Sequence, residues 1–281
     1  MYPGDDIEVL RPDLPRGRFR SVLFDFDGTL SLIREGWPQV MIPMMVEILR
    51  QTGTAETDAQ LATAVEEFVM RLNGRQTIYQ MIQLADEVRR RGGQPADPLV
   101  YKNRYHDLLM QRIGHRLAAL HSGQAAAADW TVPGSLELLE SLGRRGLTLY
   151  LASGTDLKYV RNEVDLLGLT PFFAEHIYGA LDQYKNFSKK MIIERILQEN
   201  HLRGEELLGF GDGFVEIEEV RHAGGVAVAV ASDEIKRSGI NAWKRQRLIQ
   251  AGADIVIGDY RCRERLLHYL FAGESHALPC I

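Results

Sequence analysis

The sequence predicts an α/β protein with an open parallel sheet as its core domain and an all-helical domain inserted into that core. Two observations carry this prediction. Short, continuous apolar runs alternate with helical patterns, and one long region, residues 31–128, interrupts the alternation with helical patterns and no convincing strand. Strands that alternate with helices imply parallel strands joined by right-handed crossovers. With 281 residues, the chain is long enough for two such units.

Six apolar runs are the predicted strands. The first, Ser21 to Phe26, is rich in β-branched and aromatic residues, and the others cover residues 147–152, 176–178, 207–210, 226–230 and 255–257. Most are continuous rather than alternating, as expected for parallel strands covered on both faces. Helical patterns between them span residues 135–144, 157–167, 189–199 and 216–222. The core is therefore expected to be Rossmann-like, with its ligand site at the carboxyl ends of the strands.

The inserted region contains four apolar stripes at helical spacing. Met41, Met44 and Met45 begin the first stripe, and the others run through residues 61–72, 78–85 and 109–120. Four such stripes predict a small helical bundle. The expected organisation is an N-terminal extension at residues 1–17, a core domain at 18–31 and 129–281, and a helical cap domain at 32–128.

Composition and charge exclude several kinds of partner. The formal net charge is −5, so no positive field attracts nucleic acid or an anionic membrane. No run approaches the roughly 20 apolar residues that cross a bilayer, and Met1 to Arg20 does not resemble a signal peptide. The two cysteines, Cys262 and Cys280, form no CxxC pair or other metal spacing. A cytoplasmic location is expected, with a small molecule as the ligand.

The segment Asp25-Phe26-Asp27-Gly28-Thr29-Leu30 ends the first predicted strand. Alternation along the extended chain sends Asp25 and Asp27 to the same side, where their negative charges crowd together and favour a cation between them. Gly28 permits a sharp turn, and Thr29 adds a hydroxyl. The alternative is that this segment has no catalytic role and is an Asp-Gly turn that caps a helix.

This segment resembles the first signature, DxDGT[LV], of the haloacid dehalogenase superfamily. In phosphohydrolases of that family, the first aspartate attacks phosphorus to form an aspartyl-phosphate, and the second acts as general acid and then as general base. The resemblance assigns the first role to Asp25 and the second to Asp27. A carboxylate nucleophile divides the hydrolysis of a phosphate ester into two easier displacements. The insertion after the signature matches the helical cap of the family.

The second and third signatures of the family also have counterparts. Ser153-Gly154-Thr155 follows the run at 147–152 and resembles the phosphate-binding turn, where hydroxyl and backbone N–H groups form an anion cradle. The third signature is a lysine before a helix. Lys189 suits its spacing best, while Lys185 and Lys190 remain alternatives. This lysine would hold the nucleophile and offset the charge of the phosphoryl oxygens.

The fourth signature, GDxxxD, appears as Gly211-Asp212 with Glu216 four positions after the aspartate. Glutamate replaces the commoner aspartate, so a nearby acid such as Glu218 or Glu219 remains an alternative. The resemblance implies a Mg²⁺ site made of Asp25, the backbone carbonyl of Asp27 and Asp212, with Glu216 as a further candidate. Mg²⁺ prefers such oxygen ligands and keeps several waters. The ion would shield a dianionic substrate from the attacking carboxylate.

Together these motifs predict a Mg²⁺-dependent phosphatase that hydrolyses a small-molecule phosphate monoester, for example a sugar phosphate, through an aspartyl-phosphate. Arg34 and Arg75 are the candidate contacts to the leaving group. A sugar phosphomutase of the β-phosphoglucomutase type keeps the same signatures and is the first alternative. A non-catalytic binding protein of the same fold is the second. The expected oligomeric state is a monomer or homodimer, and the long segment from Ser232 to Gln250 has no assigned role.

Overall fold

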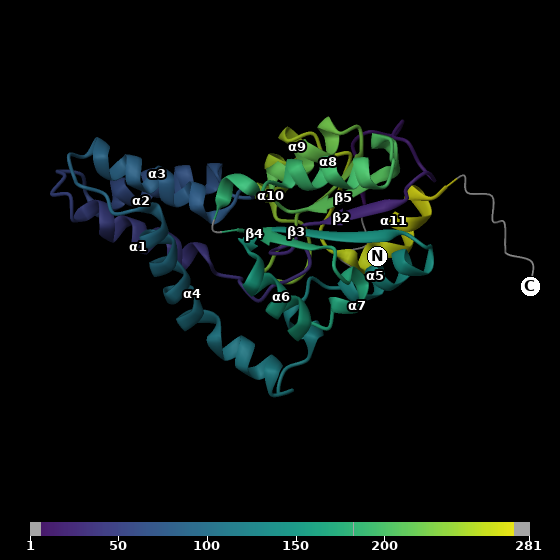
Figure 1. Cartoon of the computed structure of the whole chain (residues 1–281), viewed down its shortest axis with the longest axis horizontal. Helices are drawn as coiled ribbons and strands as arrows, with labels where there is room; N and C mark the ends of the chain where they lie inside the picture. The colour runs from purple at the N-terminus through teal and green to yellow at the C-terminus, as the bar shows by residue number, and fades with distance from the viewer. Residues whose placement is uncertain (1–6, 182, 273–281) are drawn as a thin grey trace, which may run out of the picture.

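The computed structural model describes residues 7–181 and 183–272, and Figure 1 shows a sheet with helices on both faces beside a helical bundle. In chain order, the strands are β1 (Glu8–Val9), β2 (Ser21–Phe24), β3 (Thr148–Asp156), β4 (Ile177–Ala180), β5 (Leu207–Gly211), β6 (Val226–Val230) and β7 (Ile255–Ile257). Their order across the sheet is β1-β7-β6-β5-β2-β3-β4, and every neighbouring pair is parallel except β1 with β7. The predicted open parallel sheet is confirmed.

Two layers of helices cover the sheet. On one face lie α8 (Lys189–Glu199), α9 (Phe214–His222) and α10 (Ala242–Gln250); on the other lie α5 (Ser135–Arg144), α6 (Leu157–Leu166), α7 (Thr170–Phe173) and α11 (Arg263–Leu270). Alternation along β2 supplies both apolar clusters, because Leu23 packs toward the first layer and Phe24 toward the second. Short 3₁₀ turns occur at Ala127–Trp130, Tyr184–Asn186, Gly204–Glu206 and Tyr260–Cys262.

Four helices form the inserted bundle. They are α1 (Pro38–Arg50), α2 (Asp58–Arg71), α3 (Thr77–Arg90) and α4 (Pro98–His121), and each carries one of the four predicted apolar stripes. Met41, Met44 and Met45 of α1 are buried in the bundle. The longest helix, α4, runs from the bundle back to the lower helical layer of the core in Figure 1 and packs against α6 there. The bundle is thereby tied to the core along α4.

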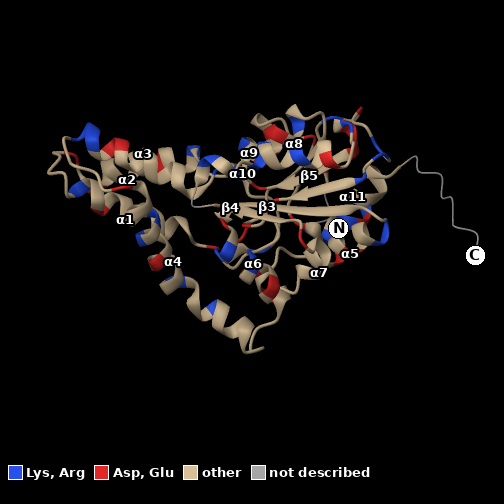
Figure 2. Cartoon of the chain, in the orientation of Figure 1, with Lys and Arg blue, Asp and Glu red and all other residues tan. Residues whose placement is uncertain are grey.

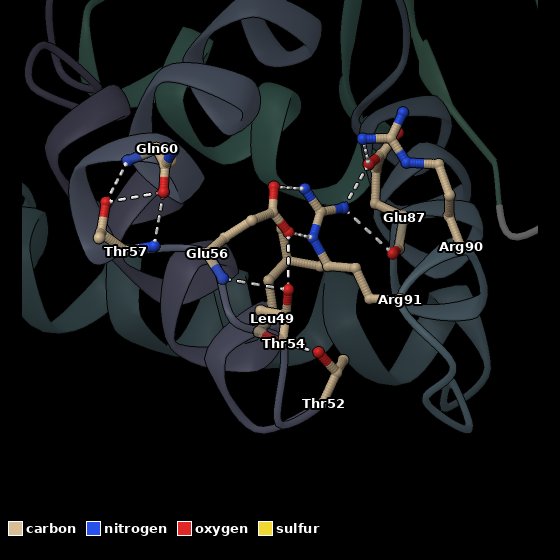
Figure 3. A network of polar contacts seen from close by, with 9 residues as sticks. All are labelled: Leu49, Thr52, Thr54, Glu56, Thr57, Gln60, Glu87, Arg90 and Arg91. Carbon is tan, nitrogen blue, oxygen red and sulfur yellow. Dashed lines mark hydrogen bonds and ion pairs between the residues drawn. The ribbon is translucent and has the colours of Figure 1, made fainter.

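Polar contacts in the bundle fix the loops between its helices, as Figure 3 shows. The Arg91 guanidinium, just after α3, donates to both carboxylate oxygens of Glu56, at 2.5 and 2.8 Å, and to Oε2 of Glu87 at 2.5 Å. Thr57 and Gln60 form a reciprocal capping box at the start of α2. The α1–α2 loop is therefore bonded to the end of α3.

Some elements differ from the sequence prediction. Strand β1 was not predicted, because two residues are too few for a periodic signal, yet it pairs with β7 through Glu8 and Val256. Strand β3 continues to Asp156, beyond the predicted end at Ala152. Cys262 is buried, and Cys280 lies outside the described residues.

Charge is mixed over the surface. In Figure 2, basic and acidic residues are interspersed on both the bundle and the core, in keeping with the small net charge of −5. Within residues 7–181 and 183–272, no helix is both long enough and apolar enough to cross a membrane.

Candidate active site

Three neighbouring strands bring the predicted site residues together. Asp25 follows β2, Ser153 and Thr155 lie near the end of β3, and Asp212 follows β5. Strand β2 lies between β3 and β5, and its last residue, Phe24, is in register with residues 151 and 210 of those strands. Parallel strands end at the same edge of a sheet, so the polar residues that follow them converge.

A buried ion-pair network holds Asp25. The Lys189 ammonium donates to Oδ1 of Asp25 and to Oε2 of Glu216, each at 2.7 Å. The side chains of these three residues are between 3% and 8% exposed. Lys189 is the first residue of α8, which Ser188 caps by accepting the Met191 N–H at 3.1 Å. The start of α8 thus places Lys189 within hydrogen-bond distance of Asp25, the candidate nucleophile.

The other two candidate lysines are not part of this network. Lys185 and Lys190 have exposed side chains, whereas Lys189 is buried. The structure therefore brings Lys189, rather than either neighbour, to Asp25.

Burial and crowding shape the electrostatics of this network. Burial raises the pKa of Asp25 well above its usual range, and the carboxylates of Glu216 and Asp212 raise it further, against the opposing effect of Lys189. Burial alone would lower the pKa of Lys189, but Asp25 and Glu216 outweigh burial and raise that pKa. The site therefore has a surplus of negative charge that favours an added cation.

Asp27 is held separately from Asp25. Its Oδ2 atom accepts hydrogen bonds from Thr155 Oγ1 at 2.9 Å and from Ser153 Oγ at 3.3 Å. Its Oδ1 atom is buried, receives no hydrogen bond from the described residues, and lies 3.6 Å from Nε of Arg34. Asp27 thus has one oxygen without a hydrogen-bond donor, beside Arg34, and the residue lines a cavity together with Asp25.

Three carboxylates can share a metal ion. Oxygens of Asp25, Asp212 and Glu216 lie within 4.8 Å of one another. The backbone N–H of Asp212 donates to Thr29 Oγ1 at 3.0 Å, which fixes the start of the loop. Both oxygens of Glu216 already accept hydrogen bonds, one from Lys189 and one from the Gly213 N–H at 2.5 Å. Glu216 therefore braces Lys189 and the start of α9, while Asp25 and Asp212 face the shared space more freely.

Arg34 is buried against an acid that the sequence did not reveal. Its Nη2 atom lies 2.6 Å from Oε1 of Glu163, and its Nε atom lies 3.1 Å from both Glu163 oxygens. Tyr105 of α4 is buried beside this pair and lines the same cavity. Glu163 therefore fixes Arg34 next to Asp27, at the junction of cap and core.

The loop between α2 and α3 closes the cavity from the cap side. A Cβ atom added to Gly74 would lie 3.2 Å from the Gly213 Cα, and one added to Gly154 would lie 2.8 Å from the carbonyl oxygen of Arg75. The backbones of the cap loop, the second signature and the fourth signature thus meet at close range. The side chain of Arg75 is exposed, although the residue lines the cavity.

Two side chains bond this loop to the core. Gln76 Nε2 donates to the carbonyl oxygens of Tyr184 at 3.0 Å and Phe187 at 2.7 Å. From α10, the Arg247 guanidinium donates to the carbonyl oxygens of residues 70, 71 and 73. The structure therefore has the cap docked over the site.

Sequence reasoning missed three residues at the site. Glu163 binds Arg34, while Lys244 and Glu234 lie beside Asp212. No local motif marks Glu163. The unusual length of the 232–250 segment was the available signal for Lys244 and Glu234.

Comparison with known proteins places this geometry in a family. Residues 19–224 match the family model of the haloacid dehalogenase-like hydrolases. No curated protein sequence matches the chain. The match covers well over half of the chain and spans all four signatures.

Solved structures share the fold. A predicted phosphoglycolate phosphatase from Haemophilus somnus 129PT is 17% identical, with 89% of this chain and 98% of that chain covered and a TM-score of 0.58. A β-phosphoglucomutase from Clostridium difficile is 11% identical, with 90% and 97% covered and a TM-score of 0.57. A family hydrolase from Deinococcus radiodurans R1, solved with bound phosphate and sodium, is 18% identical, with 90% and 96% covered and a TM-score of 0.52. The chain belongs to the haloacid dehalogenase-like hydrolases.

Proposed function

We propose that the protein is a Mg²⁺-dependent phosphatase that hydrolyses a small-molecule phosphate monoester, such as a sugar phosphate, through an aspartyl-phosphate on Asp25. The observation that carries this proposal is the placement of Asp25, buried between Lys189 and the acids Asp212 and Glu216, at the wall of the cavity between cap and core. A binding protein would have no need of a buried nucleophile and a second, separately held carboxylate within one cavity.

The donor set fits Mg²⁺. Oxygens of Asp25, Asp212 and Glu216 lie within 4.8 Å of one another. Lys189 pairs with Asp25 and Glu216, and Lys244 pairs with Asp212 and Glu234, so each cation serves two acids. A phosphate dianion cannot approach so acidic a wall unless a cation offsets the charge. We propose that Asp25 and Asp212 hold the ion together with the backbone carbonyl of Asp27. Such an ion would polarise the phosphoryl group and screen it from the attacking carboxylate.

The protein groups divide the chemistry between them. Asp25 attacks phosphorus, and Ser153, Gly154 and Thr155 bind the phosphoryl oxygens with hydroxyl and N–H groups. Lys189 stabilises the charge that builds on those oxygens. Asp27 protonates the leaving oxygen and later removes a proton from the attacking water, typically worth about 10²–10⁴-fold.

The cavity favours an uncharged leaving group. Arg34 is already paired with Glu163 and lies near Asp27, and Lys189 is engaged by Asp25 and Glu216. A leaving-group carboxylate buried beside Arg34 and Lys189 would therefore find both cations occupied, and only the exposed Arg75 at the rim could pair with it. Hydroxyl groups, in contrast, can bond to the paired side chains. This supports a polyol or sugar phosphate as the substrate.

A panel of phosphate esters tests this function. With Mg²⁺ present, we expect free phosphate from sugar and polyol phosphates, and at least about tenfold lower kcat/KM for carboxylate-bearing esters, because an unmatched buried charge costs more than an unsatisfied buried polar group, which costs about 1–3 kcal/mol. Colorimetric phosphate release is the measurement. An isomerised sugar phosphate without free phosphate would instead identify a phosphomutase, and no turnover of any ester would contradict the proposal.

Arg75 provides a second test of leaving-group binding. We propose that its exposed side chain folds over the substrate at the rim, so Arg75→Ala should raise KM several-fold, by about 1 kcal/mol of lost binding, and leave kcat nearly unchanged. Steady-state kinetics on the best ester of the panel measures both constants. Arg71→Ala is a matched control, because Arg71 is also exposed and does not line the cavity. Unchanged kinetics in the Arg75 variant would remove this residue from the site.

The surface charge supports an enzyme that acts on a small molecule. We propose that the protein has no nucleic acid or membrane partner, because its net charge is −5 and its surface charge is mixed in Figure 2. A cytoplasmic location and a monomer or homodimer stay part of the proposal.

A further inference from the structure

The segment from Ser232 to Gln250 returns over the acidic side of the site. It follows β6, the strand beside β5, and so enters the same carboxyl edge of the sheet as Asp212. Ser232 Oγ donates to the carbonyl oxygen of Gly28 at 2.9 Å, which ties the segment to the first signature. Asn241 then caps α10 by accepting the Lys244 N–H at 3.0 Å. The cap fixes where Lys244 lies on the helix.

The Lys244 ammonium occupies the second oxygen of Asp212. Its Nζ atom donates to Oδ2 of Asp212 at 2.8 Å, to Oε1 of Glu234 at 2.6 Å and to Ser232 Oγ at 3.4 Å. The Lys244 side chain is 9% exposed, and those of Asp212 and Glu234 are 12% and 19% exposed. One buried cation therefore holds one oxygen of Asp212, a candidate metal ligand, and the neighbouring carboxylate of Glu234.

We infer that Lys244 determines which divalent ion the site accepts, by limiting Asp212 to one free oxygen and keeping Glu234 out of the coordination shell. The inference rests on the metal site of the proposed function. Mg²⁺ requires a compact octahedral shell and retains waters, so one oxygen from each carboxylate suits it. Ca²⁺ takes six to eight oxygens and readily accepts bidentate carboxylates. Lys244 thus disfavours the larger ion.

Replacing Lys244 should weaken the preference for Mg²⁺ over Ca²⁺. In Lys244→Met, both oxygens of Asp212 and the carboxylate of Glu234 become available, so the affinity for Ca²⁺ should rise relative to that for Mg²⁺ by about tenfold, the lower end of what residues bonded to metal ligands contribute. Isothermal titration calorimetry on the full chain without substrate measures the two affinities. The ratio is decisive, because loss of one positive charge alone strengthens the binding of both ions equally.

The double variant Lys244→Met/Glu234→Gln separates the effect of freeing Asp212 from the effect of freeing Glu234. It also lowers the risk of misfolding. It removes the acid that Lys244 would otherwise leave buried without a counter-charge, and it still frees the second oxygen of Asp212. A smaller shift toward Ca²⁺ is expected. Lys244→Arg keeps a positive charge beside both acids and should restore most of the preference for Mg²⁺.

The outcomes distinguish this inference from the proposed function. If the unmodified chain binds Mg²⁺ and every variant keeps the same Mg²⁺ to Ca²⁺ ratio, Lys244 has no selecting role, although the metal site stands. If the unmodified chain binds neither ion, the metal site of the proposed function fails, and the inference fails with it.

Discussion

Replacement of Asp25 by Asn is expected to abolish turnover of every phosphate ester in the panel. Asparagine keeps the size of the side chain but cannot attack phosphorus, and removal of the nucleophile from other covalent hydrolases costs on the order of 10⁶-fold in kcat. A loss of at least about 10³-fold is therefore expected here. Phosphate release in the presence of Mg²⁺ measures it.

The fold of this variant should survive. Burial and neighbouring acids raise the pKa of Asp25, which means that its carboxylate is unfavourable in the bare site. An uncharged amide relieves that crowding, and Lys189 keeps its bond to Glu216. The thermal midpoint should thus stay near that of the unmodified chain. A folded Asp25→Asn protein with full activity would refute the assigned nucleophile.

The second large effect is expected for Lys189→Met, which should impair both stability and activity. Methionine fills the space but leaves Asp25 and Glu216 buried without their shared counter-charge. Removing one partner from a buried ion pair typically costs about 3–5 kcal/mol of unfolding free energy. In the proposed mechanism Lys189 stabilises the phosphoryl oxygens, so its loss should lower kcat by about 10²–10³-fold. Urea denaturation and steady-state kinetics measure the two effects.

The next residue in the chain is the matched control. Lys190 has the same chemistry but an exposed side chain, so Lys190→Met should change the unfolding free energy by less than about 0.5 kcal/mol and leave kcat unaltered. Equal losses in both variants would mean that Lys189 acts only through general surface charge.

The sequence predicted which polar residues converge at one edge of the sheet. Asp25, Ser153 and Asp212 each follow an apolar run, and parallel strands carry such positions to one edge regardless of their separation along the chain. The sequence left three candidate lysines, including Lys189. Which of these side chains faces the site depends on where the helix begins, and the Ser188 cap sets that start.

Residues that act through distant partners could not be predicted in this way. Glu163 lies on the buried face of α6 with Val160 and Val164, so its position gives no sign that its partner, Arg34, is 129 residues away. Lys244 likewise shares the buried face of α10 with Leu248. In both helices a charged residue lies on an otherwise apolar buried face. Its partner can be identified only from the tertiary structure.

Chemical trapping of the enzyme during turnover tests the central claim most directly. The protein is mixed with its best ester and Mg²⁺, quenched in acid within one turnover, digested and examined by mass spectrometry. We expect the added mass of one phosphoryl group on the peptide that contains Asp25, and its loss on treatment with hydroxylamine. A phosphoryl group on another residue, or unmodified Asp25 while phosphate is being released, would contradict it.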